Sequence, residues 1–563
     1  FTFFQLCLII YMIFINGGFI MKLKKILALA ALGAVVIPGL TSCGKQEQPG
    51  GAGVVQIKCY KGGYGDEWIR ELIARFNETF ASQNMSATLV ESSAMVTEGS
   101  KQEIYNYKKN QIDLYFTNGS DYSAIIDRSQ ATLKTSSKTL LAGLDDVLDS
   151  KGIGLDGKEE EQTLRERLFD GITEVSSYNG NNTKWQGKVF KLPWADAMTG
   201  LFANTSVLNK YGIDVPLTSD EFVSAIEKIS THTATDNVYP YSWGGNNCPG
   251  YWSFLFETWF AQYSGVKKYE NFQKCQPETG TIKDNGYEVY QDIGIKKSLE
   301  AMYPMLQLKY SPAGSASKDH TEAQVEFMTG KSAFFVNGDW VMNEMKEQYA
   351  EKSSEIVYVQ MPILSSIGTE NGLTDAQLHD VVKGIDEGKS DGEIQAVVPA
   401  ATGAALAKIR DARSIHCSIG AGHDMFVPSY SDALDATKTF IRFMYSNDGC
   451  NIFREKAWGN LPIHYTVKNP SKTTGYQASL DKVYAQGKTQ VISDNAEYNS
   501  IRSSAQIYLF NYSAWQHPNA FKNIMINHDL VVEGKKPFLP ENMFETEAQY
   551  VKDSWKSYME KVI

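Results

Sequence analysis

Four short stretches match the spacing of motifs that carry out chemistry in other proteins. The first is Thr329–Ser332, whose Gly-Lys-Ser order is that of a phosphate-binding loop. Such a loop needs a further glycine five residues before its Gly-Lys pair, and Val325 stands there. The preceding residues are also patterned as a helix, whereas a phosphate-binding loop follows a strand. We therefore interpret Gly330 as the stop signal of a helix over residues 321–329, followed by a strand over Ala333–Val336.

The other three matches also lack the context that their chemistry requires. Gly152–Gly157 has the G-x-G-x-x-G spacing, but a helix-like segment precedes it and no strand-helix-strand unit follows. Gly388–Gly392 has the G-x-S-x-G spacing around Ser390, but its surroundings are charged, whereas a nucleophile elbow follows an apolar strand. Asp149–Glu160 has two features of a calcium-binding loop, but lysine and isoleucine stand at ligand positions. We expect a surface turn at the first, a solvated loop at the second and no calcium at the third.

No other pattern points to catalysis, a metal or a cofactor. The chain has no H-E-x-x-H motif and no C-x-x-C pair, and its eight histidines show no ligand spacing. One or two disulfides and buried free thiols are both compatible with the cysteines downstream of the N-terminal region. These cysteines are Cys59, Cys248, Cys275, Cys417 and Cys450. We expect a protein that is not an enzyme and uses no cofactor.

Length and charge limit the class of partner. The chain has 563 residues and a formal net charge of −11, with 43% hydrophobic and 21% charged residues. That length is ample for two lobes with their own cores. An acidic balance without a run of lysine or arginine argues against nucleic acid, because phosphate neutralisation needs clustered cations.

The N-terminal region indicates export. We take Met21 as the translation start and residues 1–20 as upstream translation; the alternative is a membrane anchor, which an Asn-Gly-Gly interruption would make short. After Met21, three lysines precede the apolar run Ile26–Ile37 and a small-residue cleavage site, which is the order of a secretory signal. Leu40–Cys43 resembles a bacterial lipobox.

The lipobox resemblance implies that Cys43 carries a lipid and that residues 21–43 are a lipoprotein signal peptide. Residues 44–53 form a polar, Gly-rich tether without apolar residues on which to fold. We therefore expect an exported protein, held by its lipid at the outer face of the cytoplasmic membrane or on the periplasmic side.

The segment after the tether predicts a parallel sheet. Residues 54–60, 87–91 and 112–117 are patterned as strands, and residues 66–80 place six apolar side chains on one helical face. This strand-helix-strand order favours parallel pairing, with the ligand edge at the carboxyl ends of the strands. That edge carries the glycine-rich turn after the first strand and Asn118–Asp121 after the third.

A similar pattern resumes after residue 188. Thr218 and Glu221 predict a capping box at the start of a helix. Residues 241–260 combine glycine, asparagine and aromatic residues, and residues 364–413 form a polar, helix-favouring stretch that we interpret as an insertion. A further helix is predicted over residues 432–446.

Several of these motifs together resemble one protein family. The spacing Phe327-x-x-Gly-Lys-x-Ala-x-x-x-x-Gly-x-Trp340 is similar to the signature of extracellular solute-binding protein family 1, the substrate-binding proteins of carbohydrate ABC importers. The lipobox, the turn over Tyr60–Gly65, the crossover over Leu192–Asn204 and the Gly-x-x-Pro step within 457–465 occur in the same order. The resemblance covers the mature chain, with the insertion as a departure.

The resemblance implies a two-lobed α/β fold of the periplasmic-binding-protein type II, with crossovers between the lobes. Residues 54–194 plus 415–447 would form lobe 1. Residues 195–414 plus 448–563 would form lobe 2, with the insertion 364–413 near a crossover.

The resemblance also implies that Trp340 binds ligand. In the family, the tryptophan of the Gly-x-Trp step often reaches the cleft and stacks on a sugar ring. A pyranose has an apolar C–H face that suits an indole, and hydroxyl edges that need polar partners. The alternative is that Trp340 packs its helix onto the sheet.

Three other stretches supply further candidates. Trp194, Asp196 and Met198 match crossover positions that family members place against ligand. In the second stretch, groups able to stack or hydrogen-bond lie close together, and we expect roughly half of the aromatic ones to face ligand. These candidates are Trp243, Asn246, Asn247, Tyr251 and Trp252.

The third stretch is the turn after the first strand, where Gly62, Gly63 and Tyr64 would let a ligand approach the backbone. Asp121 is either an acceptor for ligand hydroxyls or a helix N-cap.

We therefore expect a monomeric binding protein that takes up a mono- or oligosaccharide and docks on ABC permease subunits not encoded in this chain. Three alternatives stay open. They are a binding protein for a polyol, phosphodiester or short peptide, a ligand sensor for a membrane receptor, and a surface enzyme that acts on glycans through a facing pair of carboxylates.

Overall fold

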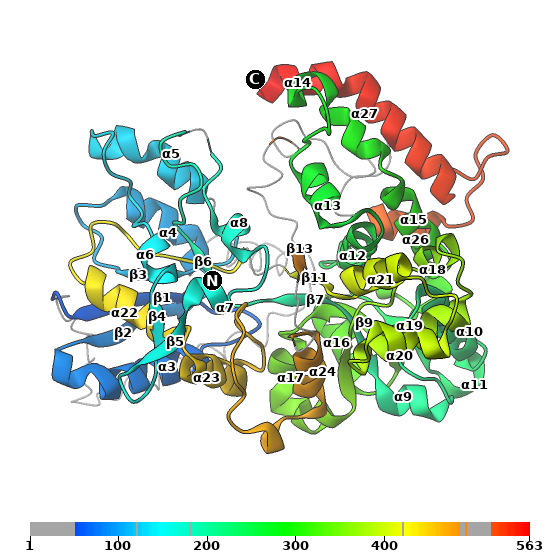
Figure 1. Ribbon diagram of the computed structural model, residues 1–563, viewed down its shortest axis with the longest axis horizontal. Coiled ribbons are helices and arrows are strands. Elements are labelled where there is room, and N and C mark those ends of the chain that lie inside the picture. The colour runs from blue at the N-terminus through cyan, green and yellow to red at the C-terminus, as the bar shows by residue number, and fades with distance from the viewer. Residues whose placement is uncertain are drawn as a thin grey trace, which may run out of the picture. The chain divides into compact units, whose positions relative to one another are not determined.

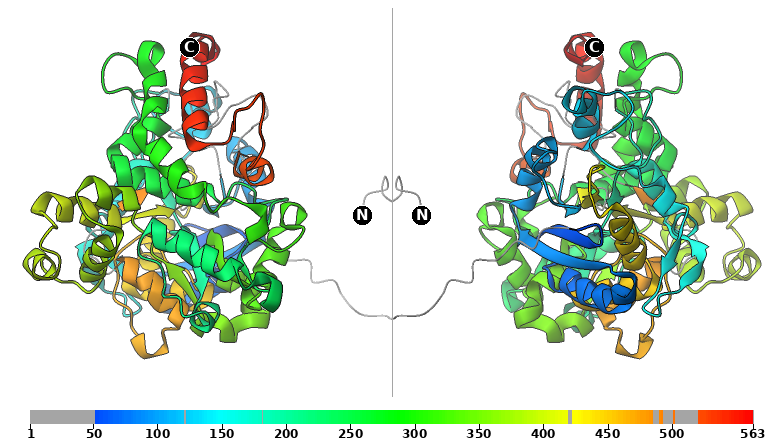
Figure 2. Two further views of the ribbon diagram at one scale, coloured as in Figure 1. Left: turned by 90° about the vertical axis from the view of Figure 1, so that its right-hand side faces the viewer. Right: turned by 90° about the vertical axis from the view of Figure 1, so that its left-hand side faces the viewer.

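Two β-sheets, each flanked by helices, organise the chain (Figures 1 and 2). The computed structural model describes residues 51–119, 122–180, 182–418, 422–484, 490–492, 501 and 520–562. These residues belong to one compact unit, Gly50–Ile563. Asp121 and the predicted signal peptide lie outside the described residues.

The first sheet is built around β1 (Val54–Tyr60). It lies between β2 (Ser86–Ser93) and β3 (Leu114–Phe116), and both pairings are parallel. β12 (Asp424–Phe426) pairs antiparallel with β3, and β6 (Leu192–Pro193) pairs antiparallel with β12. The parallel pairing predicted for the first three strands is confirmed.

An amphipathic helix, α3 (Glu67–Phe80), packs between the first sheet and α23. Its apolar positions recur every three or four residues, so they share one buried face. Trp68 on that face contacts Phe453 of α23 (Asn447–Ala457), with ring centroids 5.0 Å apart. Residues from 448 onward were predicted in lobe 2, whereas α23 packs on the first lobe; the remaining boundaries stay a prediction.

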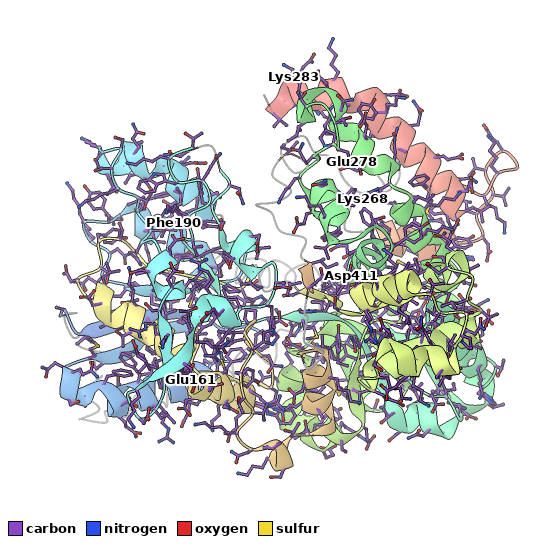
Figure 3. All side chains as sticks on the ribbon, viewed as in Figure 1. Glu161, Phe190, Lys268, Glu278, Lys283 and Asp411 are labelled. Carbon is purple, nitrogen blue, oxygen red and sulfur yellow. The ribbon has the colours of Figure 1, made fainter. Side chains whose placement is uncertain are left out.

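The other helices near the first sheet are short. A smaller apolar cluster on this side contains Phe190 (Figure 3) and Tyr115. The helices are α4 (Val96–Tyr105), α5 (Tyr122–Leu133), α6 (Asp145–Leu148), α7 (Leu164–Arg167), α8 (Ile172–Ser176) and α22 (Leu434–Met444).

The second sheet has β7 (Met198–Asn204) at its centre. β7 pairs antiparallel with β9 (Ser332–Gly338), β10 (Ile356–Val359) and β11 (Ile415–Ser418). β8 (Tyr239–Ser242) pairs parallel with β9, and β13 (Gln490–Ile492) pairs parallel with β11.

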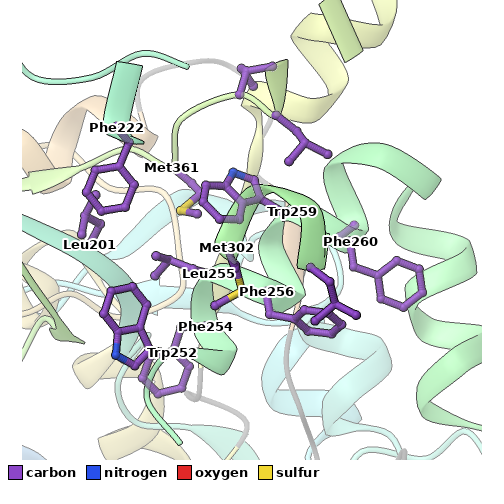
Figure 4. Packing of buried hydrophobic residues seen from close by; sticks show 14 of the residues in the cluster. Leu201, Phe222, Trp252, Phe254, Leu255, Phe256, Trp259, Phe260, Met302 and Met361 are labelled. Carbon is purple, nitrogen blue, oxygen red and sulfur yellow. The ribbon is translucent and has the colours of Figure 1, made fainter. Parts of the chain in front are cut away.

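The second lobe has the larger apolar core (Figure 4). Trp252, Trp259 and Phe222 are buried in it. Thr218 and Glu221 form the predicted capping box. The helices of this lobe are α9 (Thr205–Lys210), α10 (Ser219–Ser230), α11 (Thr233–Asp236), α12 (Ser253–Ser264), α13 (Val266–Gln273), α14 (Ile282–Asn285), α15 (Ile293–Met302), α16 (His320–Met328), α17 (Val341–Tyr349), α24 (Gly475–Tyr484), α26 (Ala520–Asn527) and α27 (Pro540–Val562).

The predicted insertion is helical and continuous with this core. Leu378, Val382 and Leu406 from the insertion are buried in the same cluster as the residues of α12. The insertion therefore adds packed layers to the second lobe. Its helices are α18 (Ser365–Glu370), α19 (Asp375–Asp386), α20 (Asp391–Val397) and α21 (Gly403–Arg413).

The motif-like stretches have structural roles. Gly330 lies beyond the end of α16 with φ of +75°, a conformation that glycine adopts without strain, and the chain then enters β9. Gly157 lies in the turn between the antiparallel strands β4 (Lys151–Ile153) and β5 (Glu159–Thr163). Ser390 is an exposed N-cap of α20. The helix stop, the surface turn and the solvated serine are confirmed.

Along the described strands, the chain passes between the two sheets three times. Residues 194–197 lead from β6 in the first sheet to β7 in the second, the chain returns to the first sheet between β11 and β12, and it reaches the second sheet again between β12 and β13. The predicted α/β architecture with crossovers is confirmed. None of the described helices combines the length and the apolar composition needed to cross a membrane.

Candidate functional site

Trp340 joins the two lobes. It follows β9 and directly precedes α17, both of which belong to the second lobe. Its side chain nevertheless packs in the apolar cluster of the first lobe and is 8% exposed. Its ring lies 6.3 Å from that of Tyr64 and 6.3 Å from that of His423.

Two glycines make room for this indole. A Cβ atom at Gly338 would lie 2.0 Å from the Trp340 ring, and one at Gly63 would lie 2.8 Å from it. Any side chain at either position would displace the ring. The glycine of the Gly-x-Trp step is therefore required by the packing of Trp340 itself. Gly63 of the first lobe lies directly against the indole.

A buried hydrogen bond lies next to Trp340. The phenol of Tyr64 donates to Oδ1 of Asp339, and both side chains are buried. Asp339 also donates its backbone N–H to Met198 O at 2.8 Å and accepts a hydrogen bond on its backbone oxygen from Tyr476. Burial raises the pKa of Asp339 well above its ordinary value, and the charge of Asp196 raises it further, against the opposing effect of Tyr64.

The helix that follows Trp340 adds two contacts to the first lobe. Asn343 Nδ2 donates to Gly63 O at 2.6 Å, and Lys346 Nζ lies 3.0 Å from Glu67 Oε2. Neither residue was predicted. Both follow Trp340 at intervals of three, which places them near the same face of α17, so helical spacing was a usable signal.

The crossing residues Trp194 and Asp196 are fully buried. Trp194 stacks on Trp68 with ring centroids 5.3 Å apart, and its Nε1 donates to Thr117 O at 2.7 Å. Asp196 Oδ2 lies 3.4 Å from Nε2 of His416. Met198, also predicted, is buried in a third cluster with Phe202 and Phe335.

The ring of His423 packs with those of Tyr64, Trp194 and Trp340. His423 was not predicted from the sequence as a site residue. Its ring lies 4.9 Å from Trp194 and 5.8 Å from Tyr64, and the side chain is 6% exposed. It precedes β12, which enters the first sheet from far along the chain, so no local pattern placed it beside Trp340.

The candidates between residues 243 and 252 have three different environments. Trp243 and Trp252 are buried in the core of the second lobe. Asn246 and Asn247 are exposed, and Asn247 binds His320 through its side chain. Tyr251 is the candidate of this stretch that packs against both main apolar clusters.

The structure thus brings together Gly63, Tyr64, Trp194, Asp196 and Trp340 at the junction of the two sheets. Met198 is linked to this group through its carbonyl. Gly62 follows β1 with the ring of Tyr60 against it, since a Cβ there would lie 2.2 Å from that ring.

A large hollow lies elsewhere in the second lobe. It measures about 1430 Å³ and is lined by residues of α19, α21 and α24. Its buried cation, Arg413, is already paired with Asp386 and donates to Met361 O at 2.9 Å. None of the predicted site residues lines this hollow.

The described residues contain no group of three or more histidine, cysteine, aspartate or glutamate side chains arranged to hold a metal ion. Cys59, Cys248 and Cys450 carry free thiols. Burial raises the pKa of the Cys450 thiol to about 12, which keeps it protonated.

Comparisons with known proteins agree with this architecture. A multiple sugar-binding protein of Streptococcus mutans serotype c is 24% identical over 180 residues, which are 31% of this chain and 40% of that protein. The match therefore spans less than half the length of that relative.

Solved structures with the same fold include a chitin oligosaccharide binding protein, with a TM-score of 0.53 and 15% identity over 90% of this chain and all of that one. Apo-form RafE from Streptococcus pneumoniae has a TM-score of 0.52 and 13% identity over 91% of this chain and all of that one. The predicted two-lobed, periplasmic-binding-protein type II fold is confirmed. The family model described as bacterial extracellular solute-binding protein matches residues 134–449, more than half of the chain. The chain belongs to the bacterial extracellular solute-binding protein family.

Proposed function

We propose that this chain is the substrate-binding lipoprotein of an ABC importer, which captures a mono- or oligosaccharide between its lobes and delivers it to a membrane permease. One observation carries the proposal. Trp340 comes from the second lobe and packs among the aromatic rings of Tyr64 and His423 in the first.

A ligand bound at this junction would change the arrangement of the two lobes. Trp340 is 8% exposed in the present arrangement, so the lobes must separate before a sugar can reach the indole face. A ligand that then contacts both lobes binds the closed arrangement more tightly than the open one and shifts the equilibrium toward closure. That shift supplies the signal a permease would recognise.

The chemistry of the junction suits an uncharged, hydroxyl-bearing ligand. Aromatic faces accept the C–H side of a pyranose, and nearby carboxyl and amide groups can accept or donate hydrogen bonds. Asp339, which directly precedes Trp340, and Asn343, which donates to Gly63 O, are two such groups. The sugar-binding relative and the solved sugar-binding proteins of the same fold support this choice of ligand class.

Export and lipid anchoring are part of the proposal. Membership of an extracellular family supports export. The lipid on Cys43 rests on the lipobox resemblance, and the docking partner would be the permease subunits.

A thermal-shift screen tests the ligand. The chain from Gly44 onward is melted with mono- and oligosaccharides, polyols and anionic solutes, because a ligand that binds only the folded state raises the melting temperature. We expect a saccharide-specific rise that Trp340→Ala abolishes. Trp185→Ala, which removes a partly buried tryptophan packed on Phe190 in the first lobe, is the matched control and should keep the rise.

Other outcomes contradict parts of the proposal. A rise only with anionic solutes would keep the family and overturn the ligand class. Conversion of the sugar into product in the same sample would show an enzyme.

A further inference from the structure

An exposed aliphatic hairpin lies between α26 and α27. Eleven large hydrophobic side chains are exposed among the described residues, and six of them fall within residues 526–550. Leu530, Val531 and Val532 are consecutive and are 42%, 53% and 50% exposed. Contiguous apolar surface of this kind marks a contact site more often than scattered apolar residues do. Figure 1 shows the connection between α26 and α27 extending beyond both helices.

The hairpin is held in a defined conformation. The backbones of Val532 and Lys535 exchange hydrogen bonds of 2.8 and 2.9 Å, and the two residues between them, Glu533 and Gly534, have φ of +50° and +76°. Positive φ at both central positions is the mark of a two-residue type I′ turn. The turn that directly follows the aliphatic residues is therefore preorganised, so little conformational entropy is lost there when the hairpin makes a contact.

The base of the hairpin is fixed to the second lobe. The ring of His528 stacks on Tyr303 with centroids 4.2 Å apart and an interplanar angle of 18°. The phenol of Tyr303 also donates to His528 O at 3.0 Å. The tip thus projects from a supported position in the lobe.

We propose that Leu530, Val531 and Val532 insert into the interfacial region of a phospholipid bilayer, with Lys535 and Lys536 at the level of the headgroup phosphates. The three exposed residues that precede the Glu533–Gly534 turn are all aliphatic, which suits a deformable apolar medium. Protein contact sites, by contrast, are dominated by Trp, Tyr and Arg.

Charge plays the smaller part in this contact. Lys535 and Lys536 are exposed next to the tip, and lysine stems can lie along apolar surface while the ammonium groups stay in water. Asp529 and Glu533 offset their charge within the same hairpin. The association should therefore depend mainly on the aliphatic side chains and only weakly on salt.

The length of the tether supports a bilayer as the partner, a step that rests on the proposed lipid at Cys43. Cys43 stands only eight positions before Gly51, so an extended connection reaches about 28 Å. A second, weak contact with the same membrane then becomes intramolecular and adds to the anchor. Three aliphatic side chains bind a membrane weakly on their own, in the range that millimolar lipid detects, and the anchor strengthens that contact.

Vesicle sedimentation tests the inference without the lipid anchor. The chain from Gly44 onward, which contains the whole compact unit Gly50–Ile563, is spun down with vesicles of phosphatidylcholine alone or with phosphatidylglycerol. We expect association with both compositions, reduced at least about fivefold by Val531→Asp. Val397→Asp changes a residue that is 62% exposed at the end of α20, and it is expected to leave the association unchanged.

Two results would overturn the bilayer contact. They are equal association of Val531→Asp and the unchanged chain, and no association of any chain at millimolar lipid. The saccharide-induced thermal shift of Val531→Asp should stay that of the unchanged chain. Loss of vesicle association and loss of sugar binding are thus separate observations, and either hypothesis can fail alone.

Discussion

The phenol of Tyr64 donates a hydrogen bond to the carboxyl group of Asp339, and this bond joins the two lobes. Tyr64 follows β1 of the first sheet, whereas Asp339 follows β9 of the second. Asn343 adds a hydrogen bond of 2.6 Å to Gly63 O beside it. These contacts link the two lobes in the present arrangement, so they stabilise it relative to any arrangement in which they are broken.

Removal of the phenolic hydroxyl should weaken both folding and ligand binding. Tyr64→Phe leaves a buried oxygen of Asp339 without its donor, which costs about 1–3 kcal/mol of unfolding free energy. The same loss falls on the closed arrangement, so the affinity for the saccharide should drop about 5- to 150-fold. Denaturant unfolding and titration calorimetry measure the two effects.

A matched substitution within one lobe separates these effects. The phenol of Tyr241 donates to Met305 O at 2.9 Å inside the second lobe. Tyr241→Phe should lower stability by a similar amount and leave the affinity unchanged. Unchanged saccharide affinity in Tyr64→Phe would contradict a role in closure.

Asp339 should make stability depend on pH. Burial holds the pKa of Asp339 well above its ordinary value in the folded state, so the folded state binds this proton more tightly than the unfolded state. The resulting stability is fully present below the unfolded pKa and is lost as pH rises through the folded pKa. Asp339→Asn cannot ionise and keeps an oxygen that can accept from Tyr64.

The melting temperatures of the unchanged chain and of Asp339→Asn, measured from about pH 4 to pH 8, test this. The melting temperature of the unchanged chain should fall relative to that of the variant as pH rises. The contributions of the other titrating groups cancel in the difference between the two melting temperatures. Two curves that run parallel over the whole range would show that Asp339 does not titrate differently on folding.

The sequence was informative where a local pattern decides the structure. Gly330 ends α16 because glycine adopts without strain the left-handed φ that often follows a helix. The parallel pairing of the strands around β1 follows from their strand-helix-strand order. The capping box at Thr218 and Glu221 is a purely local arrangement. Each of these depends on residues a few positions apart.

The candidate site depends on contacts between distant segments, so the sequence was less informative there. Trp243, Trp252 and Trp340 are all buried, but Trp243 and Trp252 lie in the core of the second lobe, whereas Trp340 packs in the apolar cluster of the first. An aromatic residue serves a core or a ligand equally well, and only the tertiary structure separates the two. His423 joins Trp340 through strand β12, whose pairing with β3 spans about 300 positions of the chain.

Trp194 should contribute mainly to stability. It is fully buried, stacks on Trp68 and donates to Thr117 O. Trp194→Ala should therefore cost about 3–5 kcal/mol of unfolding free energy. The partly buried Trp185, changed to alanine, should cost clearly less in the same denaturant experiment. A loss at Trp194 no larger than that at Trp185 would contradict its place in the core.

Gly63 should control the position of Trp340. A Cβ atom at Gly63 would lie 2.8 Å from the indole, so Gly63→Ala must displace either the turn or the ring, at a cost of about 1–3 kcal/mol. Saccharide affinity should fall, because the closed arrangement is the one disturbed.

The control is Gly99→Ala in α4, where a Cβ meets nothing within 4 Å and the helix should gain about 0.5–1 kcal/mol. Calorimetric titration and denaturant unfolding of both variants decide the matter. If Gly63→Ala binds and unfolds like the unchanged chain, the turn after β1 does not position Trp340.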